Sequence, residues 1–234
     1  VWEDEFNTQE SATRLVDEYR KRDIPVGAVM IDSPWSTSYN DFEWDRKRYP
    51  KPEAMIRDFR SKGVRTILWM TGAVNLACKD TAKQKSATYD EVVRKGYAIN
   101  DGKPGDWWKG RGVHVDFTNK AAVAWWNRQL DKAFTEGVSG WKVDQAEFWF
   151  GDGLKTSIGT LSNAEFRPYY YDAMFDYVTA RRKDGITIAR PFSHQGGYAA
   201  SIDKVSLGWC GDFSGDWSGL KQQIHNIYTS AEHG

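Results

Sequence analysis

Two aspartates, Asp144 and Asp212, each follow a short apolar run, over residues 140–143 and 207–211. Strands of a parallel barrel are buried on both faces and read as near-continuous apolar runs. The residues at the carboxyl ends of such strands face the active-site mouth. Two carboxylates brought to one mouth are the minimum equipment for cleaving a glycosidic bond. The pair therefore predicts acid, base or nucleophilic chemistry on a sugar.

Tryptophan is the compositional outlier, with 12 residues in the chain. Several tryptophans stand beside Gly, Asp or Asn rather than inside apolar stripes: Trp35, Trp69, Trp107, Trp108, Trp149, Trp209 and Trp217. Flat indole faces suit the apolar C–H faces of sugar rings. The alternative is that a large barrel simply buries its tryptophans, and for any single Trp the two interpretations are about equally weighted.

The charge balance excludes several classes of partner. The 234 residues carry 32 Lys plus Arg and 32 Asp plus Glu, so no net field attracts nucleic acid or an anionic membrane.

No apolar run reaches the ~20 residues of a membrane span. Residues 1–5 are too acidic for a signal peptide, and without an initial Met we expect the protein to begin earlier. Cys78 and Cys210 are read as reduced core thiols, which leaves the cellular compartment open.

Strand-like and helix-like segments alternate along the chain. We predict strands over residues 28–32, 65–70, 113–117, 140–144, 186–190 and 207–212. Helices are predicted to begin at Pro52, at the cap Asn119, at the capping box that starts with Ser162, and at Trp217, with Pro168 delaying or kinking the third of them. The polar stretch 71–112 is too long for a plain connector and is expected on the functional face.

This alternation predicts an α/β fold with a parallel sheet, either doubly wound or closed into a (β/α)8 TIM barrel. No Gly-x-Gly-x-x-Gly follows the first strand, which disfavours a dinucleotide fold. Residues suited to function end nearly every predicted strand: Asp32, Trp69, Asp116, Asp144, Arg190 and Asp212. A barrel uses most of its strand ends, so we favour the barrel. We expect residues 1–234 to be a partial catalytic barrel with about six β-α units, the last units lying outside the chain.

Several motifs resemble those of glycoside hydrolase family 31, the retaining α-glycosidases. They lie at residues 31–35, 41–45, 49–56, 116–119, 140–147 and 209–212. The resemblance covers nearly the whole chain and implies a barrel in which 140–144 is the fourth strand and 207–212 the sixth. It also implies flanking β-rich domains outside the chain. The first two motifs are nearer to the α-xylosidase-like branch of the family.

The resemblance implies that Asp144 is the nucleophile and Asp212 the acid/base, with Asp216 as an alternative acid. These roles require a low pKa for Asp144 and a raised pKa for Asp212. Lys142 projects from the same strand face as Asp144 and is expected to keep it ionised and to bind a sugar hydroxyl. Arg190 is placed to pair with a carboxylate or to bridge sugar hydroxyls. Lys142 and Arg190 could instead be structural.

The remaining site residues are expected to bind the substrate. Asp32 would accept hydrogen bonds from the non-reducing-end sugar, and Trp35, Trp69 and Trp209 would wall the pocket. Other polar residues near these motifs are given structural or open roles: Asp116, His114, His194, Gln145 and Glu147. Phe213 and Pro191 stand where the family usually has small polar residues.

We therefore expect a retaining, exo-acting α-glycoside hydrolase for an α-xyloside, α-glucoside or α-galactoside. Its substrate would be a glycoside or oligosaccharide. We expect no cofactor or metal, and no nucleic-acid or membrane partner. Homo-oligomers are compatible with the sequence. Two alternatives remain: a carbohydrate-binding barrel without turnover, and an α-transglycosylase that uses the same residues.

Overall fold

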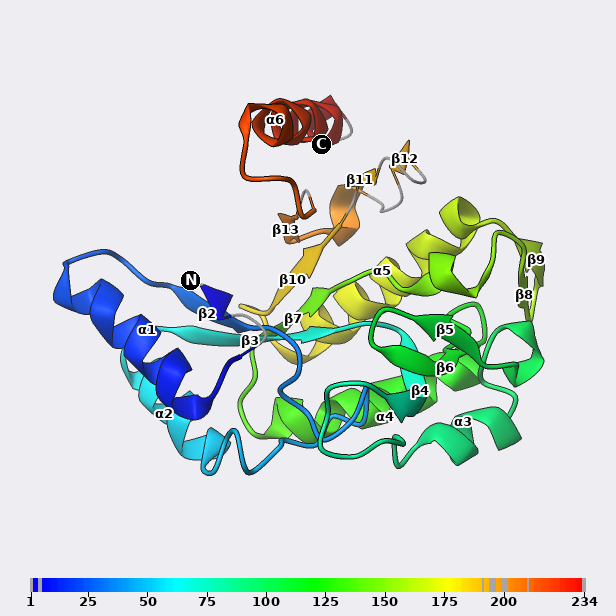
Figure 1. The fold of residues 1–234 in the computed structure, drawn as a ribbon, viewed down its shortest axis with the longest axis horizontal. Helices are drawn as coiled ribbons and strands as arrows, with labels where there is room; N and C mark the ends of the chain where they lie inside the picture. The colour runs from blue at the N-terminus through cyan, green and yellow to red at the C-terminus, as the bar shows by residue number, and fades with distance from the viewer. Residues whose placement is uncertain are drawn as a thin grey trace.

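A computed structural model describes residues 2–3, 6–190, 192–193, 197–198, 202–209 and 211–232. Its main sheet has six parallel strands in the order β1-β2-β3-β7-β10-β13 (Figure 1). The strands are β1 (Trp2–Glu3), β2 (Ala28–Ile31), β3 (Arg65–Met70), β7 (Gly140–Val143), β10 (Ile186–Ala189) and β13 (Leu207–Gly208). With helices between the strands, this is the sheet of a partial TIM barrel, as the alternation predicted.

Strand β7 lies at the centre, between β3 and β10. Lys142 is in register with Trp69 on one side and with Ile188 on the other. Gly140 begins β7 where the neighbouring strand comes close, because a Cβ at this position would lie 1.8 Å from the carbonyl oxygen of Ile186. The carboxyl ends of the three strands therefore meet at one edge of the sheet.

One predicted barrel strand is wrong. Residues 113–117 were assigned to the parallel sheet, but β6 (Gly110–His114) pairs antiparallel with β4 (Ala73–Cys78) and β5 (Gly105–Trp107). An apolar run ending in Asp fits an antiparallel strand equally well. The long stretch after β3 thus forms a small sheet of its own, with α3 (Tyr89–Arg94) and η1 (Asn100–Gly102) beside it. The sheet still has the predicted number of six parallel strands, because β1, which was not predicted, takes the place of residues 113–117 in the count.

Four of the long helices begin near the signals predicted for them, and a fifth, α1 (Gln9–Lys21), was not predicted. The four are α2 (Pro52–Ser61), α4 (Lys120–Thr135), α5 (Asn163–Arg181) and α6 (Trp217–Glu232). Asn119 caps α4 by accepting the N–H groups of Ala121 and Ala122. Ser162 and Glu165 form the predicted capping box of α5, which runs through Pro168 without a delayed start. Over the described residues, no helix is long and apolar enough to cross a membrane.

Short elements complete the described chain. They are η2 (Glu147–Phe150), β8 (Leu154–Thr156), β9 (Gly159–Leu161), β11 (Phe192–Ser193), β12 (Gly197–Tyr198) and η3 (Ile202–Lys204). The hairpin β8–β9 stands at one end of the molecule, next to the small sheet (Figure 1). Element η2 directly follows the loop that leaves β7.

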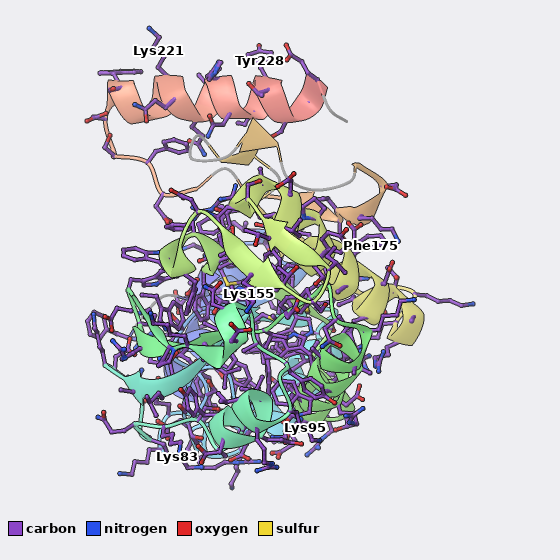
Figure 2. All side chains as sticks on the ribbon, turned by 90° about the vertical axis from the view of Figure 1, so that its right-hand side faces the viewer. Lys83, Lys95, Lys155, Phe175, Lys221 and Tyr228 are labelled. Atoms are coloured by element: carbon purple, nitrogen blue, oxygen red, sulfur yellow. The ribbon has the colours of Figure 1, made fainter. Side chains whose placement is uncertain are left out.

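Helix α6 stands apart from the rest of the body, above β10–β13 (Figure 1). Its apolar residues recur at helical spacing, but Leu220, Ile224 and Ile227 are exposed rather than packed on the sheet. Figure 2 shows Lys221 and Tyr228 pointing away from the body on the same helix. The barrel core therefore comes from the other helices.

Much of the tryptophan content is core. Buried indoles include Trp35, Trp44, Trp107, Trp125, Trp126 and Trp141. Trp141 and Phe134 stack with their planes 17° apart, and Phe42 meets Trp141 and Trp126 edge to face. Such aromatic pairs stabilise a core beyond the area they bury. For these residues the structural interpretation holds.

Candidate active site

Asp144 ends β7 and is only 8% exposed. Its Oδ2 accepts the indole N–H of Trp69 at 3.0 Å, and its Oδ1 accepts the backbone N–H of Gln145 at 2.8 Å. The strand continues in register for one residue more, because the Asp144 N–H donates to the carbonyl of Met70 at 2.9 Å. The carboxylate is thus fixed by two donors on two different elements.

Burial raises the pKa of Asp144 above its ordinary value. The positive charges of Arg190 and Lys142 oppose this effect, as do the hydrogen bonds from Trp69 and Gln145, without cancelling it. The expectation of a low pKa for Asp144 is therefore wrong. The sequence revealed the neighbouring lysine but not the depth at which the carboxylate lies.

Arg190 follows β10 and joins the two predicted catalytic aspartates. Its Nη2 lies 3.6 Å from Oδ1 of Asp144 and 3.4 Å from Oδ2 of Asp212. Since both oxygens approach one nitrogen, they cannot be farther apart than the sum of these two distances. A retaining glycosidase holds its carboxyls about 5–5.5 Å apart and an inverting one about 6.5–9.5 Å. The bound is compatible with the retaining separation.

Asp212 has a very different environment, since 75% of its side-chain surface is exposed. The preceding Gly211 has a φ of +106°, a conformation that favours glycine. A Cβ at Gly211 would also lie 3.8 Å from the guanidinium carbon of Arg190. That distance is an ordinary contact, so the backbone conformation rather than a lack of space favours glycine before Asp212.

Asp216, the alternative acid, is engaged elsewhere. Its Oδ1 accepts the backbone N–H of Gly219 at 2.8 Å and the hydroxyl of Ser214 at 2.9 Å. These bonds cap the first turn of α6 and lower the pKa of Asp216. Asp216 thus serves as a helix cap, and Asp212 remains the candidate acid/base beside Arg190.

Lys142 and Asp32 form a buried ion pair in which Nζ lies 2.8 Å from Oδ2. The other Asp32 oxygen accepts the backbone N–H of Ser33. The Lys142 ammonium and the Arg190 guanidinium each lie 3.9 Å from the centre of the Trp209 ring. Both cations are thus attracted to the electron-rich π-system of Trp209.

The predicted tryptophan wall is only partly present. Trp35 lies in the core at 2% exposure and donates its N–H to the carbonyl of Trp69, so it presents no free face to a sugar. Trp69 is equally buried but touches Asp144. An exposed indole instead occurs at Trp149, which is 47% exposed and packs at 6.1 Å against Trp108.

Other polar residues singled out from the sequence are structural or lie outside the description. Asp116 accepts hydrogen bonds from Thr118 and from the Ser157 N–H, which tie two loops together. His114 is wholly buried among aromatic rings, and burial lowers its pKa. Pro191, His194 and Cys210 lie outside the described residues.

Sequence reasoning missed Arg167, which is fully buried on α5 and pairs with the equally buried Glu147. A signal existed, because Arg167 precedes Tyr170 and Tyr171 by three and four residues, the spacing of one helix face. A charged residue on the apolar face of a helix usually has a buried partner. The partner itself could not be inferred from spacing.

The comparisons with known proteins concern the family and the fold of the chain. The family profile described as the glycosyl hydrolases family 31 TIM-barrel domain matches residues 1–234. The chain is 26% identical to alpha-xylosidase XylQ of Lactiplantibacillus pentosus over 72% of its length and 22% of that protein. It is also 26% identical to a 1,3-alpha-isomaltosidase of Kribbella flavida, covering 98% of this chain and 35% of the relative.

A solved structure shows the same fold. The cycloalternan-degrading enzyme from Trueperella pyogenes superposes with a TM-score of 0.84 at 21% identity, covering the whole chain and 37% of that enzyme. The chain thus spans about a third or less of the lengths of these proteins. Because the family profile covers every residue, the chain belongs to glycosyl hydrolase family 31 and represents its TIM-barrel domain.

Proposed function

We propose that this chain carries the active site of a retaining, exo-acting α-glycoside hydrolase. The observation that supports it most is that one nitrogen of Arg190 contacts both Asp144 and Asp212. A pair of carboxyls at this range, one buried and one exposed, suits a double displacement on a glycoside. Membership of family 31 supports the same reaction class.

In the first step, ionised Asp144 attacks the anomeric carbon and forms a glycosyl ester while the bond to the leaving oxygen breaks. Asp212 gives its proton to that oxygen. In the second step, water attacks the anomeric carbon, Asp212 takes a proton from the water, and the ester bond to Asp144 breaks. Two inversions at one carbon give net retention.

Arg190 and Trp69 prepare the nucleophile. Burial alone favours protonated Asp144, and the Arg190 charge is the largest effect that opposes it. The Trp69 N–H holds one carboxylate oxygen and so limits rotation of the group. A fixed, ionised nucleophile lowers the barrier by orientation rather than by new bonding.

The Asp32–Lys142 pair would bind the terminal sugar. Its charges lie beside Trp209, so hydroxyl-binding groups and an indole occur together. Sugar sites combine these two kinds of group, because a sugar ring has polar edges and apolar faces.

We place the substrate among α-xylosides, α-glucosides and α-galactosides. The relatives named above act, by their names, on α-xylosidic and α-1,3-isomaltosyl bonds, which supports the first two sugars. Trp149 and Trp108 offer an aromatic surface that would contact a second sugar, because Trp108 also packs on Trp69 at 6.5 Å. An oligosaccharide is therefore favoured over a simple glycoside.

A panel of nitrophenyl α-glycosides, given to the full-length protein, tests this function. We expect hydrolysis of at least one α-glycoside, with the α-anomer of the sugar as the first product seen by proton NMR. Binding of sugar without turnover would indicate a carbohydrate-binding barrel. A β-anomer as first product would contradict the retaining mechanism, and disaccharide products at high substrate would indicate transglycosylation.

A further inference from the structure

We propose that Arg167 is a positioning residue for Asp144, acting through a buried ion pair with Glu147. This inference rests on the proposed function, in which Asp144 is the nucleophile. Arg167 belongs to α5, whereas Glu147 begins η2, three residues after Asp144. The pair therefore ties the segment that leaves β7 to a separate helix.

The pair is completely inaccessible. Both side chains have 0% exposure, and the guanidinium Nε–H donates to Oε1 of Glu147. Taking two charges out of water is expensive, and apolar replacements of such pairs are often equally or more stable. Stability alone thus gives no reason for an arginine and a glutamate at these positions. Directional hydrogen bonding does, because only polar groups fix a loop at defined atoms.

The contacts continue from Glu147 to the nucleophile. The second Glu147 oxygen accepts the backbone N–H of Ala146 at 3.0 Å. The next N–H along the backbone, that of Gln145, donates to Oδ1 of Asp144 at 2.8 Å. The two peptide planes meet at the Cα of Gln145, so once the Ala146 N–H is fixed, only φ and ψ of Gln145 remain to set the direction of the Gln145 N–H. Arg167 thereby helps to aim the donor that holds the attacking carboxylate.

The helix behind the pair is firmly anchored. Helix α5 starts with the capping box of Ser162 and Glu165, and it packs against β10, β7 and η2. Farther along the same helix, the Tyr177 hydroxyl donates to Asp131 of α4 at 2.9 Å. A rigid α5 means that Arg167 offers a fixed reference point to the loop.

The segment after β7 is also held on the side of β10, and this separates the role of the ion pair from that of the Gln145 side chain. The Gln145 side chain donates through Nε2 to the carbonyl of Arg190 at 3.3 Å. This bond fixes the Gln145 side chain, while the Glu147 bond fixes the backbone before it. Loss of the ion pair should therefore rotate the backbone N–H of Gln145 without releasing the whole loop.

The test compares three variants of the full-length protein with the parent. Arg167→Met alone would leave a buried, unpaired carboxylate, so the main variant is the double replacement Glu147→Gln with Arg167→Met, which removes both charges at similar volume. Arg167→Lys keeps the charge but loses the Nε donor. Tyr177→Phe is the control, because it also removes a side-chain hydrogen bond of α5, partly buried, at a position ten residues after Arg167.

The readouts are thermal melting, affinity for the free sugar product, and covalent inactivation by a 5-fluoro glycosyl fluoride of the preferred sugar. We expect the double variant to be inactivated about 100-fold more slowly, because small displacements of a reacting group cost rates of this size. Its affinity for the sugar should stay within about twofold, since binding and orientation are separate contributions. Arg167→Lys should be slowed about tenfold, and Tyr177→Phe should react at the parental rate per folded molecule.

A double variant that is inactivated at the parental rate would overturn the inference. If the double variant does not fold, the Arg167→Lys protein decides, and an unchanged inactivation rate there would overturn the inference equally. Rates that fall only in proportion to the folded fraction, as in Tyr177→Phe, would also overturn it. A parent protein whose label forms at a residue other than Asp144 would instead remove the proposed function itself.

Discussion

The carboxyl ends of β7 and β13 deliver the same functional group into opposite environments. Asp144 is buried, holds hydrogen bonds from Trp69 and Gln145, and leads into a loop fixed by an ion pair. Asp212 is largely exposed and touches the protein body through Arg190. The difference matches two chemical tasks, because a nucleophile must be held still and an acid must exchange protons with changing partners.

Arg190 is the element common to both ends. It offers the same nitrogen, Nη2, to both carboxylates and packs its guanidinium on Trp209. The comparison therefore predicts that damage at the β7 end is uniform across substrates, whereas damage at the β13 end depends on the leaving group.

The largest effect is expected for Asp144→Asn, which removes the nucleophile. Turnover of every aryl α-glycoside should fall at least about 1,000-fold, while the fold stays intact. Steady-state kinetics with circular dichroism as the folding check measure this. Residual activity above that level would show that another group attacks the anomeric carbon.

Asp212→Ala should be selective. For substrates with poor leaving groups we expect a loss of about 100-fold, because their departure needs a proton. Substrates with good leaving groups should be hydrolysed at nearly the parental rate in the glycosylation step. An equal defect across a series of aryl leaving groups would mean that Asp212 is not the acid.

Arg190→Met tests the residue between the two ends. The Arg190 charge lowers the pKa of Asp144 against the effect of burial, so its removal should raise that pKa further. Since the ionised form attacks, the acidic limb of the kcat/KM profile should move to higher pH, with a loss of about tenfold at the optimum. A limb that stays in place would argue that Asp144 does not govern it.

Trp149→Ala should weaken the binding of longer substrates only. We expect KM for a disaccharide to rise about fivefold, in line with the loss of one aromatic contact. Aryl α-glycosides, whose second group is small, serve as the control and should be little affected. Equal changes for both kinds of substrate would place Trp149 outside a second sugar site.

The smallest effect concerns stability. Because the folded-state pKa of Asp144 is raised, the folded protein loses stability as pH rises from the ordinary value of 3.8 through the raised one. Asp144→Asn does not titrate, so its melting temperature at neutral pH should exceed that of the parent by about 2–4 °C. The advantage should vanish below pH 3.8, and a less stable variant at neutral pH would contradict the argument.

Elements whose ends are marked by local residues could be predicted from the sequence. Caps such as Asn119 and Ser162 act through neighbouring backbone groups, so their effect is visible in a short window. The strand ends that carry Asp144 and Arg190 were found for the same reason. Residues 113–117 were misplaced because an apolar run does not reveal which partner strand it pairs with.

Other features depend on packing between distant segments. The burial of Asp144, the core position of Trp35 and the Glu147–Arg167 pair arise from contacts across many residues of sequence. Spacing predicts which face of an element a side chain occupies, but not how deeply that face is covered. Burial at this depth raises the pKa of Asp144, and for that reason the low pKa predicted from its neighbours was wrong.

Covalent trapping tests the central claim most directly. The full-length protein, treated with a 5-fluoro glycosyl fluoride of its preferred sugar and digested, should yield one glycosylated peptide, with the ester on Asp144. A label on another residue, or full turnover of substrate without any trapped ester, would contradict the claim that β7 supplies the nucleophile.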